Sequence, residues 1–327
     1  MLDHQNVWHT YTPFQSSANV QEFLCRIYLK NNIEDAEKKS YQNCYPFIYY
    51  LEHGKSYYQL SDQAPLSIKP VLLFYGMTQL LKACLLSVDP QYPDSTSVLA
   101  HGVSTRKRKK QSYDFLKDEV RVQKNGLFSH FSEAMFQVEH LDGEKITMIS
   151  LLKRIPELNS LFDFSYGENV SFPLERSEYS YGINKTILDN FHMTEERFSH
   201  FIMNSTKGNL DISVKRVSNL IEISFDNQHL LTPLNCHPFY YHHTLNSYFL
   251  TTDRDLTSYF PEVMVHYLLL YNLSMISRYE TEWWSELLQN ASTKDLPFIQ
   301  QFIQTTSIKI PFLLSTFLYS KKKEQSY

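Results

Sequence analysis

Glycine is scarce in this chain, with 8 among its 327 residues. Few glycines leave few positions for positive-φ turns and few places where the backbone can approach a phosphate closely. No G-x-G-x-x-G pattern occurs, which argues against nucleotide folds built on glycine-rich loops. The G-x-S-x-G, H-E-x-x-H and paired-carboxylate patterns are also absent from the sequence. We therefore predict no catalytic residues and favour a role other than catalysis, although catalytic groups can also assemble in space.

Cysteine and long apolar runs are scarce as well. The cysteines are Cys25, Cys44, Cys84 and Cys236. They show no paired spacing, which predicts reduced thiols. The first ten residues are polar, unlike a signal peptide, and the longest apolar stretch, Val71–Val88, is interrupted by Gly76, Gln79 and Lys82. Such a stretch predicts a buried helix rather than a membrane span, so we expect a cytoplasmic protein without a membrane partner.

Aromatic residues, in contrast, are abundant at 15% of the chain, with 23 Tyr and 22 Phe. Hydrophobic residues at 43% and charged residues at 20% are typical of a globular protein, and the chain is long enough for one large or two ordinary domains. Tyrosine hydroxyls need hydrogen-bond partners when they are buried, and tyrosine rings in a cleft are available for stacking.

Both ends of the chain have helical patterns. Apolar residues recur at helical spacing over 16–28, and a second helix is predicted over about 45–60, with Pro46 in its first turn. Pro70 opens a third helix that Asp89 and Pro90 end, and its apolar residues on nearly every side predict a central position. A long helix is predicted from Pro261 to about Leu288, one or two helices follow, and residues 321–323 are expected in a solvated tail.

The middle of the chain has a different pattern. Short runs of β-forming residues alternate with turn residues over 170–174, 211–214, 220–225 and 239–249, and a helix is predicted over 194–203. We therefore predict an α+β fold. Its helical ends, 1–145 and 259–327, pack on each other, and the β-rich segment 146–258 is inserted between them.

Residues 91–126 are polar and irregular, and they contain the densest positive charge of the chain. Five consecutive cations, Arg106–Lys110, occur in a chain whose formal net charge is −4. Clustered cations bind phosphates of nucleic acids or nucleotides, and the alternative is a solvated loop. His101 and Ser104 add hydrogen-bonding groups just before the run. The predicted ligand-binding residues of this loop are His101, Ser104, Arg106, Lys107 and Arg108.

Two further cations occur within apolar helical patterns. Lys82 interrupts the predicted central helix, with Tyr75 on the adjoining face. Arg278 lies one turn before Glu282, so an intrahelical ion pair is one interpretation. If the helices pack together, Lys82 and Arg278 could instead converge on one anion, with Arg278 supplying a planar fork and Lys82 a point charge. We therefore add Lys82, Arg278 and Tyr75 to the predicted ligand-binding residues, with the Tyr75 ring available to stack on a base.

The densest group of residues that could bind a metal comprises Cys236, His237, His242 and His243. Their spacing matches no standard zinc pattern. Successive residues of a strand point to opposite faces, which separates His242 from His243. We predict neither a metal site nor a cofactor.

Several segments of the chain resemble the YaaC-like family of Bacillus-type proteins. They are Trp8-His9-Thr10-Tyr11, Pro70 to Met77, Leu80 to Ala83, His101-Gly102-Val103-Ser104, and Leu273 to Tyr279 with Trp283-Trp284. The resemblance covers most of the chain. Members of the family tend to be encoded beside IMP dehydrogenase, which implies a connection to purines and a protein partner in purine metabolism.

Some of the same helical segments distantly resemble HEPN-type proteins, many of which are RNases. Those proteins carry an Arg followed by a His on one helix, at a longer spacing than Arg197 and His200 have here. From residues and resemblance together, we expect a regulatory protein that recognises a phosphate-bearing ligand, with a purine nucleotide as the expected ligand. The alternatives are an RNA-directed nuclease of the HEPN type, with RNA as partner, and a protein–protein adaptor.

Overall fold

The chain forms two compact units, one of which is inserted into the other in sequence. The computed structural model describes residues 7–105, 113–178, 180–205, 212–217, 219–225, 231–291 and 293–323. Met1–Met148 and His266–Tyr327 form one unit, which we call the helical unit. Ile149–Val265 form the other, which we call the mixed unit.

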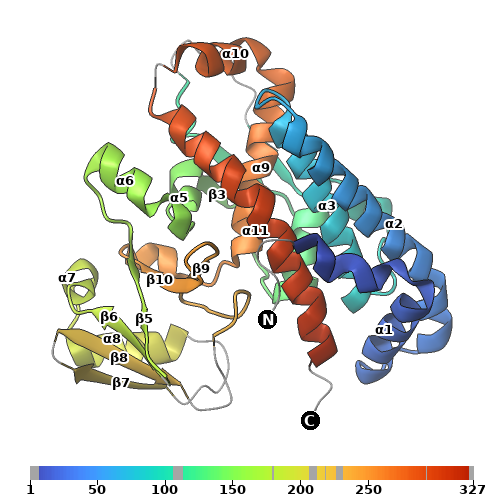
Figure 1. Ribbon diagram of the computed structural model, residues 1–327, viewed down its shortest axis with the longest axis horizontal. Helices are drawn as coiled ribbons and strands as arrows, with labels where there is room; N and C mark the ends of the chain where they lie inside the picture. Colours follow the sequence, from blue (N-terminus) through green and yellow to red (C-terminus); the bar gives the residue numbers. More distant parts are fainter. Residues whose placement is uncertain are drawn as a thin grey trace. The chain divides into compact units, whose positions relative to one another are not determined.

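The helical unit is built mainly from long helices (Figure 1). They are the 3₁₀ helices η1 (Val7–Gln15) and η2 (Thr96–Leu99) and the α-helices α1 (Ser17–Lys30), α2 (Ala36–Gln63), α3 (Lys69–Val88), α4 (Leu127–Phe136), α9 (Glu262–Tyr279), α10 (Thr281–Asn290) and α11 (Asp295–Lys323), with α9 entering the unit at His266. Helix α3 packs against α1, α2, α4 and α11, and Figure 1 shows α2 alongside it. It is therefore the central helix, as its sequence predicts.

Helix α3 owes its position to its apolar surface. Leu73, Phe74, Met77 and Leu80 are fully buried. Pro70 lies in the first turn, where its missing N–H is not needed, and the Asp89 N–H bonds the Leu85 carbonyl at the other end. By length and composition α3 could cross a membrane, with a mean hydropathy of 1.6 over its most apolar window, and 67% of that window is buried inside the protein. A buried core helix has these same properties.

The two ends of the chain pack on each other. The Tyr11 hydroxyl of η1 donates to the Pro311 carbonyl of α11 at 2.7 Å. The Tyr319 hydroxyl of α11 donates to the Thr10 carbonyl at 2.9 Å. These reciprocal bonds fix the amino-terminal segment on the last helix.

A small antiparallel sheet accompanies the helices of this unit. Its strand order is β1–β2–β3, with β1 (Val103–Thr105), β2 (Glu119–Val122) and β3 (Lys145–Thr147). Ser104 lies opposite Arg121, and Val120 lies opposite Ile146. The expectation of an irregular segment over 91–126 is therefore wrong for β1 and β2. Each has only three or four residues, which is too short for a clear alternating pattern.

The mixed unit combines short helices with two antiparallel sheets. The sheets have the strand orders β4–β10–β9 and β5–β6–β8–β7. The strands are β4 (Ser171–Pro173), β5 (Glu175–Arg176), β6 (Ser180–Asn184), β7 (Ile212–Val217), β8 (Leu220–Phe225), β9 (Tyr240–His242) and β10 (Ser247–Thr251). The helices are η3 (Pro156–Leu158), α6 (Asn159–Tyr166), α7 (Ile187–Phe191), α8 (Glu195–Ser205) and η4 (Arg254–Thr257), and α5 (Met148–Leu152) leads into the unit. The predicted α+β fold, with helical ends and a β-rich middle, is confirmed.

One buried cation connects the parts of the mixed unit. The Arg154 guanidinium, 7% exposed, donates to the Tyr240 hydroxyl at 2.5 Å and to the Leu256 carbonyl at 2.7 Å. It also lies over the ring of Phe260, 5.2 Å from its centroid. Arg154 thereby ties β9 and η4 to the start of the unit.

Three predicted helix boundaries are wrong. Helix α2 begins at Ala36 rather than near residue 45, and Pro46 lies inside it on the exposed side. The polar residues before Pro46 obscure the helical pattern there. The predicted long helix to Leu288 breaks at Glu280, whose ψ of 46° leaves the helical region and starts α10. Lys321, expected in a solvated tail, lies inside α11 with its ammonium 5.3 Å from the Phe317 ring.

Candidate functional site

His101 lies two residues before β1, and the backbone that follows it is held in place by two glycines. Gly102 has a φ of +77° and Gly126 a φ of +131°, and a Cβ added at Gly126 would lie 2.3 Å from the Gly102 nitrogen. Only glycine allows this close approach. The His101 carbonyl accepts hydrogen bonds from the Tyr267 hydroxyl at 2.8 Å and from the Phe128 N–H at 3.2 Å. The position of His101 is therefore set by α4 and α9 as well as by the strand that follows it.

The imidazole of His101 lies among aromatic rings of α3 and α9. Its centroid is 5.0 Å from the ring of Phe74, 5.7 Å from that of Tyr271 and 6.3 Å from that of Tyr75, all edge to face. Burial lowers the pKa of His101, and the positive charges of Arg278 and Lys82 lower it further. The imidazole is consequently neutral at pH 7, with one N–H donor and one acceptor nitrogen.

Arg278, at the end of α9, points toward α3. Its guanidinium donates to the Ser274 carbonyl at 3.1 Å and to the Tyr75 hydroxyl at 3.2 Å. It also lies over the rings of Tyr75 and Tyr279, at 5.8 and 5.2 Å from their centroids. None of these contacts is with a carboxylate in the part of the chain that the structure describes. The interpretation of an Arg278–Glu282 ion pair is therefore wrong, because the side chain turns toward Tyr75 instead.

Lys82 approaches the same group of residues from α3. It lies two helical turns after Tyr75 and so on the same face of the helix. Its ammonium lies 5.6 Å from the ring centroid of Tyr50, and burial lowers the pKa of Lys82. Within the described ranges this ammonium forms no ion pair with a carboxylate. The Tyr50 ring partly offsets the cost of burying this charge.

Together these residues form what we call the His101 cluster, comprising His101, Lys82, Arg278 and Tyr75. These four predicted ligand-binding residues, which are spread over positions 75 to 278 of the chain, thus lie in one region of the helical unit. Two cations lower the pKa of one imidazole, and neither pairs with a carboxylate within the described residues. The local field is therefore positive, and it favours an anion over a cation or a metal ion.

Ser104 is engaged elsewhere in the helical unit. Ser104 accepts a hydrogen bond from the Gln123 side-chain amide at 2.7 Å, which engages its hydroxyl within the small sheet. Arg106, Lys107 and Arg108 lie outside the described residues.

The chain after the basic run is anchored to buried acids. The Tyr113 hydroxyl donates to the carboxylate of Asp118, which also accepts from the Asn272 amide at 3.1 Å. The Asp295 carboxylate accepts the backbone N–H of Phe115 at 3.1 Å, and burial raises the pKa of Asp295. These bonds hold residues 113–118 against α9 and the start of α11.

Sequence reasoning missed two aromatic residues that contact the His101 cluster. Tyr271 is one of them, although it precedes Arg278 by two helical turns and shares its face of α9. Tyr57, whose ring stacks on Tyr75 with centroids 6.0 Å apart, is another. The helical spacing from Arg278 could have identified Tyr271. Nothing in the sequence relates Tyr57 to Tyr75, because they lie on different helices.

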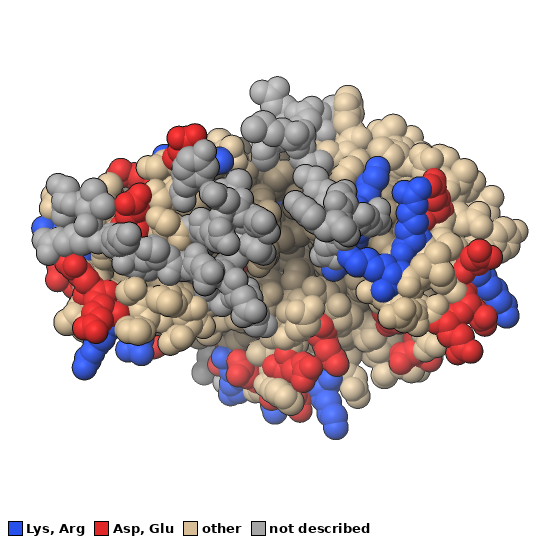
Figure 2. All heavy atoms as spheres, turned by 90° about the horizontal axis from the view of Figure 1, so that it is seen from below, with Lys and Arg blue, Asp and Glu red and all other residues tan. Residues whose placement is uncertain are grey.

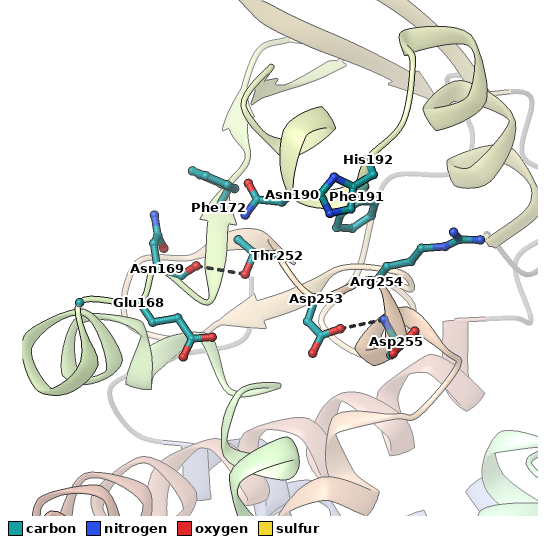
Figure 3. Close-up of a pocket in the computed structure, with 11 residues that line it drawn as sticks. Glu168, Asn169, Phe172, Asn190, Phe191, His192, Thr252, Asp253, Arg254 and Asp255 are labelled. Carbon is teal, nitrogen blue, oxygen red and sulfur yellow. Dashed lines mark hydrogen bonds between the residues drawn. The ribbon is translucent and has the colours of Figure 1, made fainter.

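The mixed unit contains a separate open cavity of about 700 Å³ (Figure 3). It is lined by Gly167, Glu168, Asn169, Phe172, Asn190, Phe191, His192, Thr252, Asp253, Arg254 and Asp255. None of these residues was predicted to bind a ligand. Figure 3 shows the Asp253 side chain directed to the backbone nitrogen of Asp255, a residue of η4.

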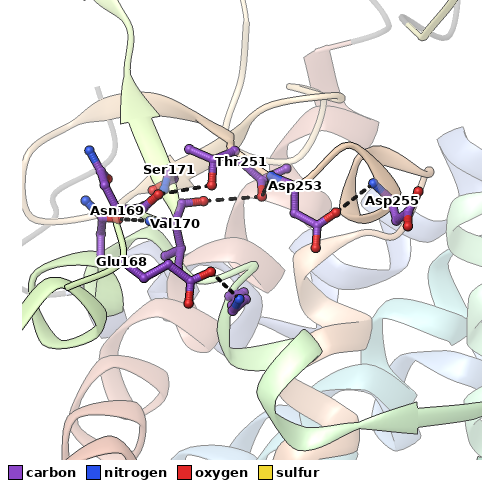
Figure 4. Close-up of polar contacts among 10 residues, drawn as sticks. Glu168, Asn169, Val170, Ser171, Thr251, Asp253 and Asp255 are labelled. Atoms are coloured by element: carbon purple, nitrogen blue, oxygen red, sulfur yellow. Dashed lines mark hydrogen bonds and ion pairs between the residues drawn. The ribbon is translucent and has the colours of Figure 1, made fainter. Parts of the chain in front are cut away.

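The polar side chains around this cavity mostly hold the fold together (Figure 4). Glu168 pairs with Lys153 at 2.5 Å, and Asp253 accepts the Asp255 N–H at 2.9 Å. The Asn159 side chain accepts two backbone N–H groups near the start of β4, each at 3.0 Å. These groups already have hydrogen-bond or ion-pair partners, and most of the other residues that line the cavity are exposed. We therefore consider this cavity a weaker candidate for a ligand site than the His101 cluster.

No metal centre emerges from the described side chains, and the face drawn in Figure 2 carries mixed charge. No group of three or more His, Cys, Asp or Glu residues among them could hold a metal ion. His242 instead faces Glu157 at 3.9 Å. On the face drawn in Figure 2, the described Lys and Arg side chains are interspersed with Asp and Glu. This mixture of charge differs from the continuous basic stripe that nucleic-acid binding favours.

Comparison with known proteins gives one match, to a family model. No curated protein and no solved structure matches the chain. The model of the family described as YaaC-like Protein matches residues 12–318. This match includes every residue of the His101 cluster and covers nearly the whole length. The chain therefore belongs to the YaaC-like family.

Proposed function

We propose that this protein binds a phosphate-bearing ligand at the His101 cluster, and that it acts as a regulatory protein rather than an enzyme. The observation that supports the proposal most strongly is the pair of cations, Lys82 and Arg278. Both are near enough to lower the pKa of the same imidazole, and neither contacts a carboxylate within the described residues. Desolvated cations without a counter-charge gain free energy from a bound anion.

The three polar groups have complementary roles in this proposal. Arg278 offers a planar set of N–H donors that can bind two phosphate oxygens at once. Lys82 supplies a compact charge from the opposite helix. The neutral imidazole of His101 donates one further hydrogen bond, and it becomes a third cation if the phosphate raises its pKa.

A purine nucleotide is the ligand we propose. The rings of Tyr75 and Tyr57 already stack on each other, and such faces also suit a purine base. The resemblance of the chain to proteins encoded beside IMP dehydrogenase points to the same class of ligand. In this proposal the phosphate neutralises the cations, and the base contacts the tyrosines.

Thermal unfolding with a ligand panel tests the proposal. The panel comprises AMP, GMP, IMP, ATP and GTP, the nucleosides adenosine, guanosine and inosine, and inorganic phosphate. We expect at least one nucleotide to stabilise the protein, by about 2.7 kcal/mol at a hundredfold excess over Kd, and its nucleoside to do so far less. Absence of stabilisation by every phosphate-bearing compound would overturn the proposal.

Two matched variants connect the effect to the cluster. Arg278→Met and Lys82→Met remove one charge each while keeping most of the side-chain length, and we expect each to abolish most of the ligand-induced stabilisation. Lys69→Met removes a charge from the first turn of the same α3 helix that is not among the charges lowering the pKa of His101, and it should leave ligand binding unchanged. Equal losses in all three variants would indicate a general charge effect and contradict the assignment.

An RNA-directed nuclease is the second candidate. The observation in its favour is that a neutral imidazole, able to accept a proton, lies beside a guanidinium able to hold a phosphate. This candidate predicts cleavage of single-stranded RNA that is lost in His101→Gln, whereas the regulatory proposal predicts intact RNA with the wild-type protein. Incubation with end-labelled RNA therefore separates the two functions.

A further inference from the structure

Helix α2 carries a row of exposed tyrosines on its outer face. Tyr41, Tyr45 and Tyr49 are 67%, 52% and 56% exposed. Their spacing of four residues places them on one side of the helix, and the rings of Tyr45 and Tyr49 lie 6.1 Å apart. The opposite side of α2 packs against α1 and α3, as Figure 1 shows. We call this row the tyrosine stripe.

The tyrosine stripe is not needed for the fold of the chain. A contiguous row of exposed rings differs from the isolated apolar side chains of an ordinary surface, and such rows mark sites of association. Tyrosine is enriched in interfaces because its ring buries a large area while its hydroxyl stays hydrated or hydrogen-bonded.

Opposite charges lie at the two ends of the tyrosine stripe. Lys38 precedes Tyr45 by seven residues, and Glu52 follows it by seven. Seven residues are about two helical turns, or about 10 Å, so both charges lie on the same face as the rings. Both side chains are exposed, and neither forms an ion pair within the part of the chain that the structure describes.

The tyrosine stripe and its flanking charges are complementary to the same surface on a second copy of the chain when the two α2 helices run antiparallel. A two-fold axis at Tyr45 brings the partner's Tyr45 against it and places Tyr41 level with the partner's Tyr49. The same axis places Lys38 level with the partner's Glu52, at both ends of the contact. A parallel arrangement would instead place Lys38 beside the partner's Lys38. The charges therefore select the antiparallel pairing.

We propose that two copies of this chain associate through the tyrosine stripes of their α2 helices, antiparallel and centred on Tyr45. One helical face of this length buries less than the about 1,600 Å² of a typical stable complex. The dimer is consequently reversible and dependent on concentration. The proposal uses none of the residues of the His101 cluster and stands independently of the ligand.

Sedimentation velocity over protein concentrations of about 1–100 µM tests the dimer. We expect wild type to change from monomer to dimer within this range and Tyr45→Glu to stay monomeric, because it places two like charges at the axis. Phe164→Glu is the matched control, since Phe164 is 90% exposed and lies in the mixed unit. It should dimerise as wild type does. A wild type that stays monomeric, or a Tyr45→Glu dimer of wild-type strength, would overturn the proposal.

A charge-reversal pair tests the antiparallel register. Lys38→Glu and Glu52→Lys each place like charges together, and we expect each to raise the dimer dissociation constant at least about tenfold. The double variant Lys38→Glu/Glu52→Lys restores opposite charges and should return the constant to near the wild-type value. Both substitutions lie on the exposed face, so the unfolding temperatures of all three variants should match wild type. A double variant that is as weak as the single variants would contradict the antiparallel pairing.

Discussion

The guanidinium of Arg278 donates a hydrogen bond to the hydroxyl of Tyr75, 3.2 Å away, although the two residues are 203 positions apart in the chain. This bond joins α9 to the central helix α3 beside His101. It directs the cation toward α3 rather than toward Glu282 of α10. The positive charge of the candidate site depends on this orientation of the Arg278 side chain.

The first prediction concerns the charge around His101. Arg278→Met and Lys82→Met should each raise the pKa of His101, because each removes a positive charge that opposes protonation of the imidazole. Lys69→Met should leave this pKa unchanged. NMR titration of the imidazole resonances measures the effect. An identical titration curve in wild type and both cluster variants would show that the cations do not act on the ring.

The second prediction concerns the pH dependence of anion binding. The charged groups that face His101 are Arg278 from α9 and Lys82 from α3, with the hydroxyls of Tyr75 and Tyr271 nearby. A bound anion raises the pKa of His101, so binding takes up a proton and becomes tighter as the pH falls from about 8 to about 5. Calorimetry with sulfate, whose charge is constant over this range, measures the change. In His101→Gln the affinity for sulfate should no longer depend on pH. Affinity that weakens on acidification would contradict the prediction.

The third prediction concerns Gly126. A Cβ at this position meets the Gly102 nitrogen at 2.3 Å, at a φ of +131°. Gly126→Ala should therefore lower the free energy of unfolding by about 3 kcal/mol or more, and displace His101. Gly167→Ala is the control, because its φ is +63° but nothing lies within 4 Å of the added carbon. Gly167→Ala should lower the free energy of unfolding by about 1 kcal/mol. Chemical denaturation of both variants measures the difference, and equal costs would be evidence against a tight glycine contact.

The fourth prediction concerns the pair of His130 on α4 and Asp89 after α3, whose atoms Nε2 and Oδ2 lie 2.9 Å apart. The hydrogen bond to Asp89 raises the pKa of His130, and the bond to His130 lowers the pKa of Asp89. The contribution of protonated His130 to the free energy of unfolding is fully present below about pH 6.5, and it is lost as the pH rises through the raised pKa of His130. The contribution of ionised Asp89 to the free energy of unfolding is fully present above about pH 4, and it is lost as the pH falls through the lowered pKa of Asp89.

The pair therefore stabilises the protein most between about pH 4 and 6.5. His130→Gln should lower the free energy of unfolding more at about pH 5.5 than at about pH 8.5, with a difference of about 1 kcal/mol. Urea unfolding at the two pH values measures this difference. A larger loss at the alkaline value would show that the charged pair contributes nothing.

The sequence indicated much of the fold because its signals are local. Apolar residues at helical spacing, with Pro70 at one end and Asp89 at the other, predicted α3 to within one residue of its observed start. The alternating residues of β8 predicted that strand directly. Signals failed where they were weak, as in the three-residue strand β1 or the polar first turns of α2.

The candidate site was predicted only in part. Lys82 and Arg278 were conspicuous as cations within apolar helices, and His101 because it precedes the basic run. The sequence left open whether Arg278 pairs with Glu282 or turns toward α3, since both geometries suit an arginine at that position. It also contained no sign of the stacking of Tyr57 on Tyr75.

The amino-acid sequence by itself determined which segments are helical, which face of each helix is buried, and which cations lie within apolar surroundings. These properties depend on side-chain spacing and on the cost of burying charge, which act over a few residues. Only the tertiary structure decided that residues 75, 82, 101 and 278 lie together. Their proximity depends on how α3 packs beside α9 and on the close contact of Gly102 with Gly126, and both are contacts between residues far apart in the chain.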